Sequence, residues 1–514
     1  MSHDLPPDDS GDSPTLSRRS LLVSASALAL GGLPADAAPA TDSDLTGLSA
    51  TEAVARMARG ELGAERYATA LLARAEALKS FNAFISLDPA LVLEAAREAD
   101  KARARKAPRG LLHGLPIPVK DSLNTRDYPT TGGTPALKDF RPREDAPLVA
   151  RLREAGAVVF GKTNLHELSF GWTSNNLAFG AVRNPYDPKR IPGGSSGGTA
   201  AAIAARIAPL GVAEDTEGSI RVPAAFCGIK GFRPTTGRYS TAGAVPISPL
   251  FDQAGPHART VEDLELFDHA LTGEAPLATP SSLKGVRLAV ARQFWFAGLD
   301  EEVARVTEAA LGLLRKAGAE LVELEVPGLE ALIAATTDQV QNHDVRVELA
   351  RYLATYGAGV DFRTLVAAAS SDIRATFAHD VLEGGPGFVS EQAYRDAVDT
   401  HLPALRRTFR EYFAKTGAAA LVFPATMVTP PLIGDETELR VAGKPVRFDI
   451  AVARNIAPGS TAGLPGLVLP AGLSRDGLPV ALEFDGPAAS DRALLALGRA
   501  IERELPPLPA PRLT

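Results

Sequence analysis

The chain has 514 residues, of which 45% are apolar and 22% are charged, so it predicts a globular protein with one large core or two to three domains. Its formal net charge of -7 offers no basic surface for nucleic-acid phosphates. Cys227 is the only cysteine, which excludes an intrachain disulfide and zinc sites of the CxxC type.

Residues 1–40 have the order of an export signal. Arg18 and Arg19 precede a short apolar run, and Ala35-Asp36-Ala37 follows as an A-x-A cleavage pattern. The run is too short to span a membrane, and the rest of the chain offers no unbroken apolar run of about eighteen residues. We expect a twin-arginine signal and linker, a periplasmic or secreted protein, and no stable membrane insertion after processing. The alternative is a tail with a chance arginine pair.

Helices and strands alternate through the first half of the chain, which favours an α/β sheet. Ser49 and Glu52 have the capping-box spacing at the start of a helix that Gly60 interrupts. Apolar spacing then predicts, in order, a helix over 67–78, a strand over 84–87, helices over 90–105 and 148–152, a strand over 158–160 and a turn over 161–164.

Lys120 stands at the end of an apolar strand, residues 114–121. A lysine at the mouth of a buried strand can lose about two or more pKa units by desolvation and act as a neutral base. Local spacing alone favours an ordinary surface pair of Lys120 with Asp121, because nothing nearby indicates burial.

His166 has no histidine partner one helical turn away and lies in a segment that reads as a helical face, so a structural histidine is favoured over a metal ligand. A Ser-His-Asp triad has no local signature, although the fold alone could gather one.

The stretch from Ile191 to Arg221 reads as loop, helix, loop, with an alanine-rich helix over 200–208 between two Gly/Ser loops. Such loops bring hydroxyl and N–H groups close to a ligand. A P-loop fails because Thr199 and Ala200 follow Gly198. A nucleophile elbow is disfavoured because turn residues, not a strand, precede Gly193, and a dinucleotide fingerprint is absent.

Three segments together resemble the amidase signature family of Ser-Ser-Lys hydrolases. They are residues 119–121, the Gly193-Gly194-Ser195-Ser196-Gly197-Gly198 loop and residues 215–221, and the spacing from Ser195 to Ser219 matches the family. The resemblance covers Leu48 to Glu504. Segments 170–176, 179–187 and 455–466 look closest to its arylacetamide members, the mandelamide and indoleacetamide hydrolases.

The resemblance implies three catalytic roles. Ser219 is expected as the acylated nucleophile, Ser195, preceded by a cis peptide bond, as the bridging serine, and Lys120 as the neutral base. A bridging hydroxyl can donate and accept a proton at once. The backbone N–H groups of Thr216, Glu217, Gly218 and Ser219 are expected to form the oxyanion hole, each contributing on the order of 3 kcal/mol.

The chain departs from the family pattern beside the nucleophile. Glu217 precedes Gly218 where the family usually has Gly-Gly, and Ala213-Glu214 stands where it usually has Gly-Thr. A Glu217 carboxylate that pointed inward would repel the oxyanion, whereas one that pointed outward would leave the backbone donors unchanged. We expect it to point outward.

The rest of the chain reads as strands and helices that shape the acyl pocket. Expected are strands over 283–290, 321–324 and 420–424, a partner strand of the last one over 467–470, and a helix over 301–316. Residues 331–413 are mostly helical, and their aromatic side chains either line a substrate-facing cap or belong to the core; they are Tyr352, Tyr356, Phe362, Phe377, Phe388 and Tyr394.

The resemblance implies an α/β amidase signature fold, a mixed twisted sheet covered by helices on both faces with a helical cap. We expect one amidase domain over residues 45–510, with residues 331–413 as a substrate-facing helical insertion. No cofactor and no metal are expected, and a homodimer stays open.

The expected activity is hydrolysis of a small arylacetamide such as mandelamide or indoleacetamide to acid and ammonia through an acyl-serine. The alternatives are peptide amide, anilide or carbamate hydrolysis with the same triad, or a silent binding protein because of Glu217. An amidotransferase subunit is disfavoured, because export would separate the chain from cytoplasmic partners.

Overall fold

The computed structural model describes residues 42–107 and 110–513. The predicted export signal over residues 1–40 lies outside these residues. The segment Asp42–Thr514 forms one compact unit. Within the two described ranges, every helix is too short or too polar to cross a bilayer.

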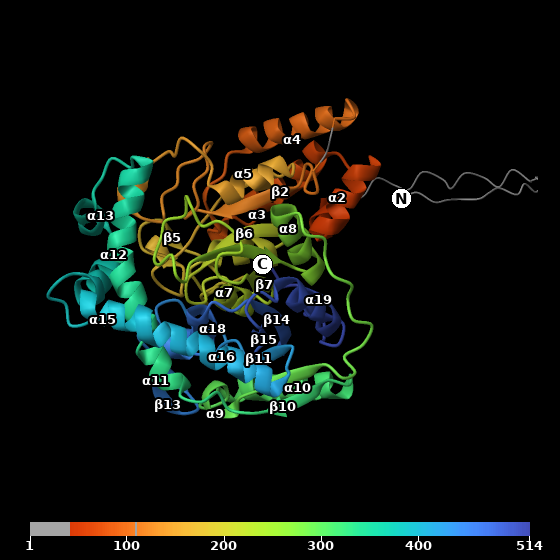
Figure 1. Cartoon of the computed structure of the whole chain (residues 1–514). Coiled ribbons are helices and arrows are strands. Elements are labelled where there is room, and N and C mark those ends of the chain that lie inside the picture. The colour runs from red at the N-terminus through yellow and green to blue at the C-terminus, as the bar shows by residue number, and fades with distance from the viewer. Residues whose placement is uncertain (1–41, 108–109, 514) are drawn as a thin grey trace, which may run out of the picture. The chain divides into compact units, whose positions relative to one another are not determined.

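One mixed sheet organises the described residues (Figure 1). The pairs β3–β2, β2–β6, β11–β9 and β9–β10 are parallel, and the remaining pairs, including the edge pair β1–β3, are antiparallel. In spatial order the strands are β1 (Phe84–Ser86), β3 (Val158–Thr163), β2 (Pro116–Lys120), β6 (Leu210–Asp215), β8 (Gln253–Ala258), β7 (Lys230–Arg233), β14 (Gly466–Leu473), β15 (Pro479–Asp485), β11 (Ala420–Pro424), β9 (Arg287–Val290) and β10 (Glu320–Glu323).

Helices cover both faces of this sheet, as expected. Side chains of a strand point alternately to its two faces. In β14, Leu467 packs where Gly498 of α19 (Asp491–Glu502) leaves no room for a side chain. Its neighbour Val468 lies in a buried cluster with Ala224 of α7 (Arg221–Phe226) and Ala200 of α6 (Gly197–Ala204). The helices α7 and α19 therefore lie on opposite faces.

The strongly periodic elements form where the sequence predicts them. Ser49 caps α2 (Ala50–Arg59) by accepting a hydrogen bond from the Glu52 N–H, and Gly60 ends this helix in the left-handed conformation. The other helices outside residues 329–416 are α1 (Asp42–Gly47), α3 (Ala64–Ala77), α4 (Pro89–Ala104), α5 (Pro147–Glu154), α8 (Val261–Thr272), α9 (Arg292–Trp295), α10 (Glu301–Lys316), α17 (Phe448–Ala453) and α18 (Ala457–Ala462).

Several strand predictions are wrong. The sequence predicts that a loop follows the alanine-rich helix, but residues 210–215 form β6 in the middle of the sheet. The predicted turn over 161–164 is mostly strand, since β3 continues to Thr163. Residues 467–470 do not pair with 420–424, because β15 lies between β14 and β11. Two hairpins, β4 (Asn175–Asn176) with β5 (Gly180–Ala181) and β12 (Glu438–Val441) with β13 (Lys444–Arg447), stand apart from the large sheet.

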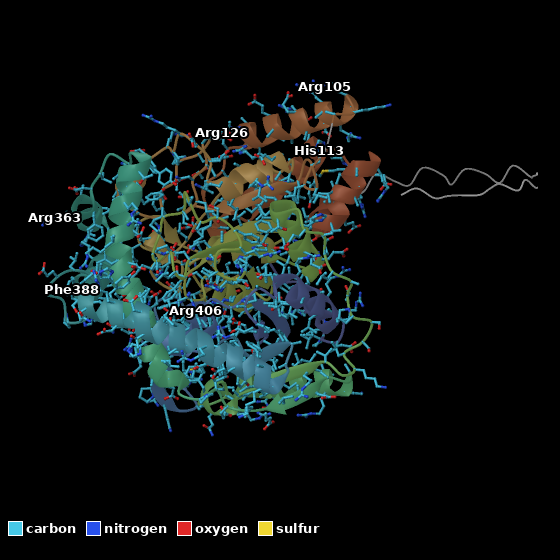
Figure 2. All side chains as sticks on the ribbon, in the orientation of Figure 1. Arg105, His113, Arg126, Arg363, Phe388 and Arg406 are labelled. Atoms are coloured by element: carbon cyan, nitrogen blue, oxygen red, sulfur yellow. The ribbon has the colours of Figure 1, made fainter. Side chains whose placement is uncertain are left out.

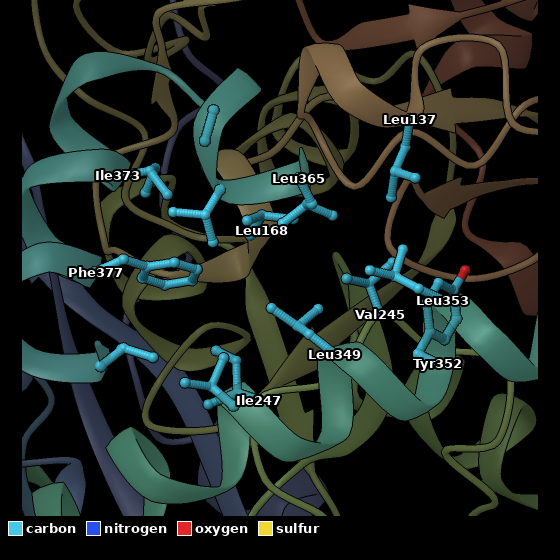
Figure 3. Packing of buried hydrophobic residues seen from close by; sticks show 14 of the residues in the cluster. Leu137, Leu168, Val245, Ile247, Leu349, Tyr352, Leu353, Leu365, Ile373 and Phe377 are labelled. Carbon is cyan, nitrogen blue, oxygen red and sulfur yellow. The ribbon is translucent and has the colours of Figure 1, made fainter. Parts of the chain in front are cut away.

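Residues 331–413 are mostly helical, as predicted, and an apolar cluster joins them to the sheet region (Figure 3). Leu349 and Leu353 of the longest helix there lie beside Leu168 and Val245, which belong to loops near the sheet. Whether this stretch is a substrate-facing insertion stays a prediction. Its helices are α11 (Leu329–Ala334), α12 (Thr337–Tyr356), α13 (Phe362–Ala368), α14 (Ser371–Thr376), α15 (Glu391–Asp396) and α16 (Leu402–Thr416).

The aromatic side chains of this stretch pack within it. Tyr352 and Phe377 belong to the apolar cluster, and Tyr356 and Phe362 pack against it. Tyr394 stacks on His343 with ring centroids 3.9 Å apart. The guanidinium of Arg346 lies 4.9 Å from the ring centroid of Phe388, which is labelled in Figure 2. For Tyr352, Tyr356, Phe362 and Phe377, core packing is therefore the correct reading.

Candidate active site

The ends of two neighbouring parallel strands bring Lys120 and Glu214 together. β2 ends at Lys120 and β6 ends at Asp215, and the two strands pair through Val119 and Val212. Because carboxyl ends of parallel strands meet at one edge of a sheet, this edge is where α/β folds place ligands. The loop before α6 reaches the same edge with Ser195.

Lys120 is fully buried and its amino group has three described partners. Nζ lies 2.7 Å from Ser195 Oγ, 2.8 Å from Glu214 Oε2 and 3.2 Å from the Glu214 carbonyl oxygen. Burial lowers the pKa of Lys120, and the Glu214 carboxylate opposes that change. The local expectation of a surface pair with Asp121 is wrong, because Asp121 instead pairs with Lys162 at 2.8 Å.

Ser195 follows a cis peptide bond from Gly194, as the resemblance implied. Its carbonyl oxygen accepts hydrogen bonds from the His166 N–H and the Ser174 hydroxyl, each 3.1 Å long. A Cβ at Gly194 would lie 2.7 Å from the Trp172 carbonyl carbon, so only glycine fits there. These contacts hold the Ser195 hydroxyl against Lys120.

Ser219 lies on the neighbouring loop. Its carbonyl oxygen accepts a 3.3 Å hydrogen bond from the Ser196 N–H. The residue is 4% exposed and lines a cavity. Within residues 42–107 and 110–513, no residue forms a hydrogen bond with the Ser219 hydroxyl. The hydroxyl is therefore available to a molecule in the cavity.

A buried ion-pair network supports the Ser219 loop. Asp215 accepts hydrogen bonds from the Gly218 N–H (2.7 Å), the Ile220 N–H (2.9 Å) and Arg221 Nε (3.0 Å). Arg221 also contacts Glu483 at 2.5 Å. Although burial alone would raise it, these cationic and N–H partners lower the pKa of Asp215 to about 2. The carboxylate is thus ionised at neutral pH and fixes the loop.

The predicted oxyanion hole is only partly available. The Gly218 N–H is taken by Asp215, so its assignment as a free donor is wrong. The N–H groups of Thr216, Glu217 and Ser219 have no acceptor within the part of the chain that the structure describes. Two or three converging N–H donors are what a tetrahedral oxyanion requires.

Glu217 does not point away from the site. Its side chain lines the cavity, and its Oε2 accepts a 2.9 Å hydrogen bond from Gln341 Nε2 in α12. Our expectation of an outward orientation is therefore wrong. Burial, with Asp338 nearby, raises the pKa of Glu217 to about 8. The carboxyl is mostly protonated at neutral pH, and an uncharged group does not repel an oxyanion.

The cavity beside Ser219 has a volume of about 320 Å³. Aromatic side chains, Phe170 and Trp172, form one part of its lining, and the Trp172 indole N–H donates to the Glu217 carbonyl oxygen at 2.9 Å. The other part is polar and comes from several elements: Asp338, Gln341 and Asn342 of α12, Thr376 at the end of α14, Asp380 in the π-helical segment Phe377–Val381, Arg447 at the end of β13 and Asp449 of α17. An aromatic ring and polar substituents both find partners here.

Histidine takes no part in the arrangement of Lys120, Ser195 and Ser219. His166 is buried in extended backbone rather than on the predicted helical face, and its Nδ1 lies 3.0 Å from Thr173 Oγ1. His257 contacts the Ile220 carbonyl oxygen at 2.7 Å. Burial lowers the pKa of each histidine to about 4. His166 is therefore a structural residue, as the sequence favoured.

Sequence reasoning missed the role of Glu214 as a direct partner of Lys120 and the hydrogen bond from Gln341 to Glu217. Glu214 was visible as a departure from the family pattern, but its direction depends on β6, which was read as a loop. Gln341 carries no local signal. Within residues 42–107 and 110–513, no group of three His, Cys, Asp or Glu side chains is arranged to hold a metal ion.

Comparisons with known proteins agree with this geometry. The amidase family model matches residues 66–495. The indoleacetamide hydrolase of Agrobacterium vitis is 37% identical over 89% of this chain and 97% of its own length. The mandelamide hydrolase of Pseudomonas putida is 37% identical over 90% and 92%.

A solved structure supports the same assignment. The crystal structure of an amidase superposes with a TM-score of 0.80 and 34% identity, covering 89% of this chain and all of that one. Its match and the mixed sheet confirm the expected fold class. Family, fold and the Lys120–Ser195 contact beside Ser219 agree, and the chain belongs to the amidase family of amide hydrolases.

Proposed function

We propose that the protein hydrolyses small primary arylacetamides to the acid and ammonia, with Ser219 as the nucleophile. The observation that carries the proposal is the buried 2.7 Å contact of Lys120 with Ser195, whose neighbour Ser196 donates a hydrogen bond to the carbonyl oxygen of Ser219 at the cavity. Phe170 and Trp172 offer an aromatic wall for the aryl group. The names of the indoleacetamide and mandelamide relatives support this substrate class over anilides, carbamates and peptide amides.

The reaction begins when the Ser219 oxygen attacks the amide carbonyl carbon. Its proton passes to Ser195, whose own hydroxyl proton passes to the neutral amine of Lys120. The carbonyl oxygen becomes negatively charged and accepts hydrogen bonds from the free N–H groups of the Thr216 to Ser219 loop, each worth on the order of 3 kcal/mol in the transition state.

Collapse of this intermediate breaks the C–N bond. The leaving nitrogen takes the proton back from Lys120 through Ser195 and departs as ammonia, which leaves an ester on Ser219. Water then attacks the ester carbon and gives its proton to the same relay. The Ser219 oxygen leaves with that proton, and the free acid is released.

The silent-protein alternative rested on Glu217. Its carboxyl is mostly uncharged at neutral pH because its pKa is about 8, and Gln341 holds it at the cavity wall. Both features support a working oxyanion site. We therefore favour an active enzyme.

Ammonia release tests the proposal. The purified protein is given phenylacetamide, mandelamide, indole-3-acetamide and, as an aliphatic comparison, propionamide. We expect a higher kcat/KM for the aryl compounds, no release by Ser219→Ala and unchanged release by Ser240→Ala, a change at an exposed serine. Equal rates with propionamide would refute the aryl preference, and release that persisted in Ser219→Ala would refute the nucleophile.

We also propose that the twin-arginine pair Arg18-Arg19 exports the protein to the periplasm or the medium. Changing both arginines to lysine is expected to retain the protein in the cytoplasm of a cell that has this pathway. An unchanged location in cell fractions would refute export by this route. Whether the protein forms a homodimer, which the sequence leaves open, is tested separately by light scattering of the purified protein.

A further inference from the structure

Glu214 lies in the site, but the proposed roles of Lys120, Ser195 and Ser219 do not explain its function there. Its side chain is buried, and Oε2 lies 2.8 Å from Lys120 Nζ. The same oxygen accepts a 3.1 Å hydrogen bond from the Ser169 hydroxyl, and Oε1 accepts a 3.3 Å hydrogen bond from the Thr216 hydroxyl. The carboxylate is therefore fixed from three sides and does not depend on a substrate for its position.

The partners of Lys120 Nζ fit both protonation states of Lys120: all three can accept the N–H bonds of the ammonium, and the Ser195 hydroxyl can instead donate to a neutral amine. A neutral amine has two N–H bonds and one lone pair. Two of the three partners, the carboxylate and the carbonyl oxygen of Glu214, can only accept hydrogen bonds. When Lys120 is neutral, both of its N–H bonds therefore point to Glu214, and its lone pair faces the Ser195 hydroxyl at 2.7 Å. This is the direction in which a base must accept the proton of Ser195.

We propose that Glu214 is a positioning residue of the amide hydrolysis. It orients the neutral Lys120 so that its lone pair faces Ser195, and its negative charge stabilises the ammonium that Lys120 becomes after the proton arrives. One proton moves from Ser219 to Ser195 and one from Ser195 to Lys120, and Glu214 neither gives nor takes a proton in these steps. The inference rests on the proposed attack by Ser219.

The neighbouring acid, Asp252, does not replace Glu214 in this role. Its Oδ1 lies 2.6 Å from the Thr216 hydroxyl oxygen, which also contacts Glu214. Burial and the charge of Glu214 raise the pKa of Asp252 to about 8. Asp252 is therefore mostly uncharged near neutral pH, and Glu214 supplies the negative charge in direct contact with Lys120.

The other ionisable groups around Lys120 are occupied or neutral. Asp215 is ionised, but its oxygens bind Arg221 and the Ser219 loop. His166 and His257 have pKa values of about 4, because burial disfavours their charged forms. Neither histidine titrates in the range from pH 5 to 9 in which the relay is measured.

The test is the pH dependence of covalent labelling of Ser219 by a fluorophosphonate, followed by intact-protein mass spectrometry. This reaction needs an activated Ser219 but no particular amide. In Glu214→Gln, which keeps the shape and removes the charge, the acid limb of the labelling rate is expected at a pH lower by about 1 to 3 units. The rate on the plateau is expected to fall about tenfold or more, because a less basic amine accepts the proton.

Two further variants make the result specific. Glu214→Thr, which introduces the residue usual in the family, also removes the charge and is expected to move the acid limb the same way. Glu265→Gln changes another buried glutamate, which pairs with Arg499 in the contact of α8 with α19, and is expected to keep the wild-type profile. Thermal unfolding of each variant verifies that it is folded.

The outcomes separate this inference from the function on which it rests. An acid limb that moves down in the uncharged variants supports the role of Glu214. A slower rate with an unmoved limb would mean a merely structural role and would overturn it, as would a limb at higher pH. A folded wild type that is not labelled at all would overturn the Ser219 assignment and the relay together.

Discussion

Replacing Asp215 by asparagine tests how much the buried network under the Ser219 loop contributes to folding. The Asp215 side chain is fully buried and accepts hydrogen bonds from Gly218, Ile220 and Arg221. An asparagine has nearly the same shape, but it loses the charge and turns an N–H group toward partners that are all donors.

The magnitude follows from the pKa of Asp215. Although burial opposes ionisation, Arg221 and the other partners lower this pKa from an ordinary 3.8 to about 2, which corresponds to about 2 kcal/mol of stability at neutral pH. Leaving the buried Arg221 with Glu483 as its remaining carboxylate adds to the loss, and breaking buried pairs costs about 3 to 5 kcal/mol in total. We expect a loss of about 2 to 5 kcal/mol for Asp215→Asn.

The pH dependence of this loss has a definite sign. Because the folded-state pKa of Asp215 is depressed, its contribution is present in full above pH 3.8 and is lost as the pH falls through about 2. The difference between wild type and variant is therefore expected to be the same at pH 7 and pH 5.

Urea unfolding followed by circular dichroism at these two pH values measures the loss. Asp476→Asn, at an exposed loop position, is the matched control and is expected within about 0.5 kcal/mol of wild type. A loss below about 1 kcal/mol for Asp215→Asn, or a loss that shrinks between pH 7 and pH 5, would refute the reasoning.

Three further predictions concern the cavity and the loop that carries Ser195. Since the pKa of Glu217 is about 8, wild-type kcat/KM is expected to fall above that pH, because a charge develops beside the oxyanion. The kcat/KM of Glu217→Gln is expected to stay constant over the same range, and an equal fall in both proteins would contradict this. Gly194→Ala places a Cβ 2.7 Å from the Trp172 carbonyl carbon and is expected to cost about 1 to 3 kcal/mol in unfolding experiments; an unchanged melting temperature would count against it. Trp172→Phe loses the 2.9 Å hydrogen bond to the Glu217 carbonyl oxygen, so kcat/KM for arylacetamides is expected to fall about fivefold or more, and an unchanged value would speak against that contact.

The sequence predicts the periodic elements well and the central strands poorly. The helix over 301–316 has an apolar face at helical spacing, which is a local property, and it forms where predicted. β6 and β8 contain glycine, proline or charged residues, for example Gly211 and Pro256, that local strand propensity disfavours. They are strands because their neighbours supply hydrogen bonds and bury both faces, which a single segment does not encode.

The same division holds for the site. The Gly/Ser loop and the spacing to Ser219 indicate the chemistry, because few other arrangements require those residues together. The burial of Lys120 is not a local property, since β3 and β6 on either side create it. For that reason its own neighbourhood favoured a surface pair with Asp121, and only the resemblance indicated a base.

The direction of a side chain in a loop is the least predictable feature. Glu217 was expected to point outward because its neighbours match the family. Gln341, more than one hundred positions away, instead holds it at the cavity wall. The pairing of Glu214 with Lys120 likewise depends on the position of β6 beside β2 in the sheet, which neither segment alone indicates.

The central claim is that an acyl group passes through Ser219. The most direct measurement is peptide mapping by mass spectrometry after a turnover mixture with an activated aryl-acetyl ester is quenched in acid. We expect one aryl-acetyl adduct, on the peptide that contains Ser219, and no adduct in Ser219→Ala. An adduct on another residue, or turnover in Ser219→Ala, would contradict the account.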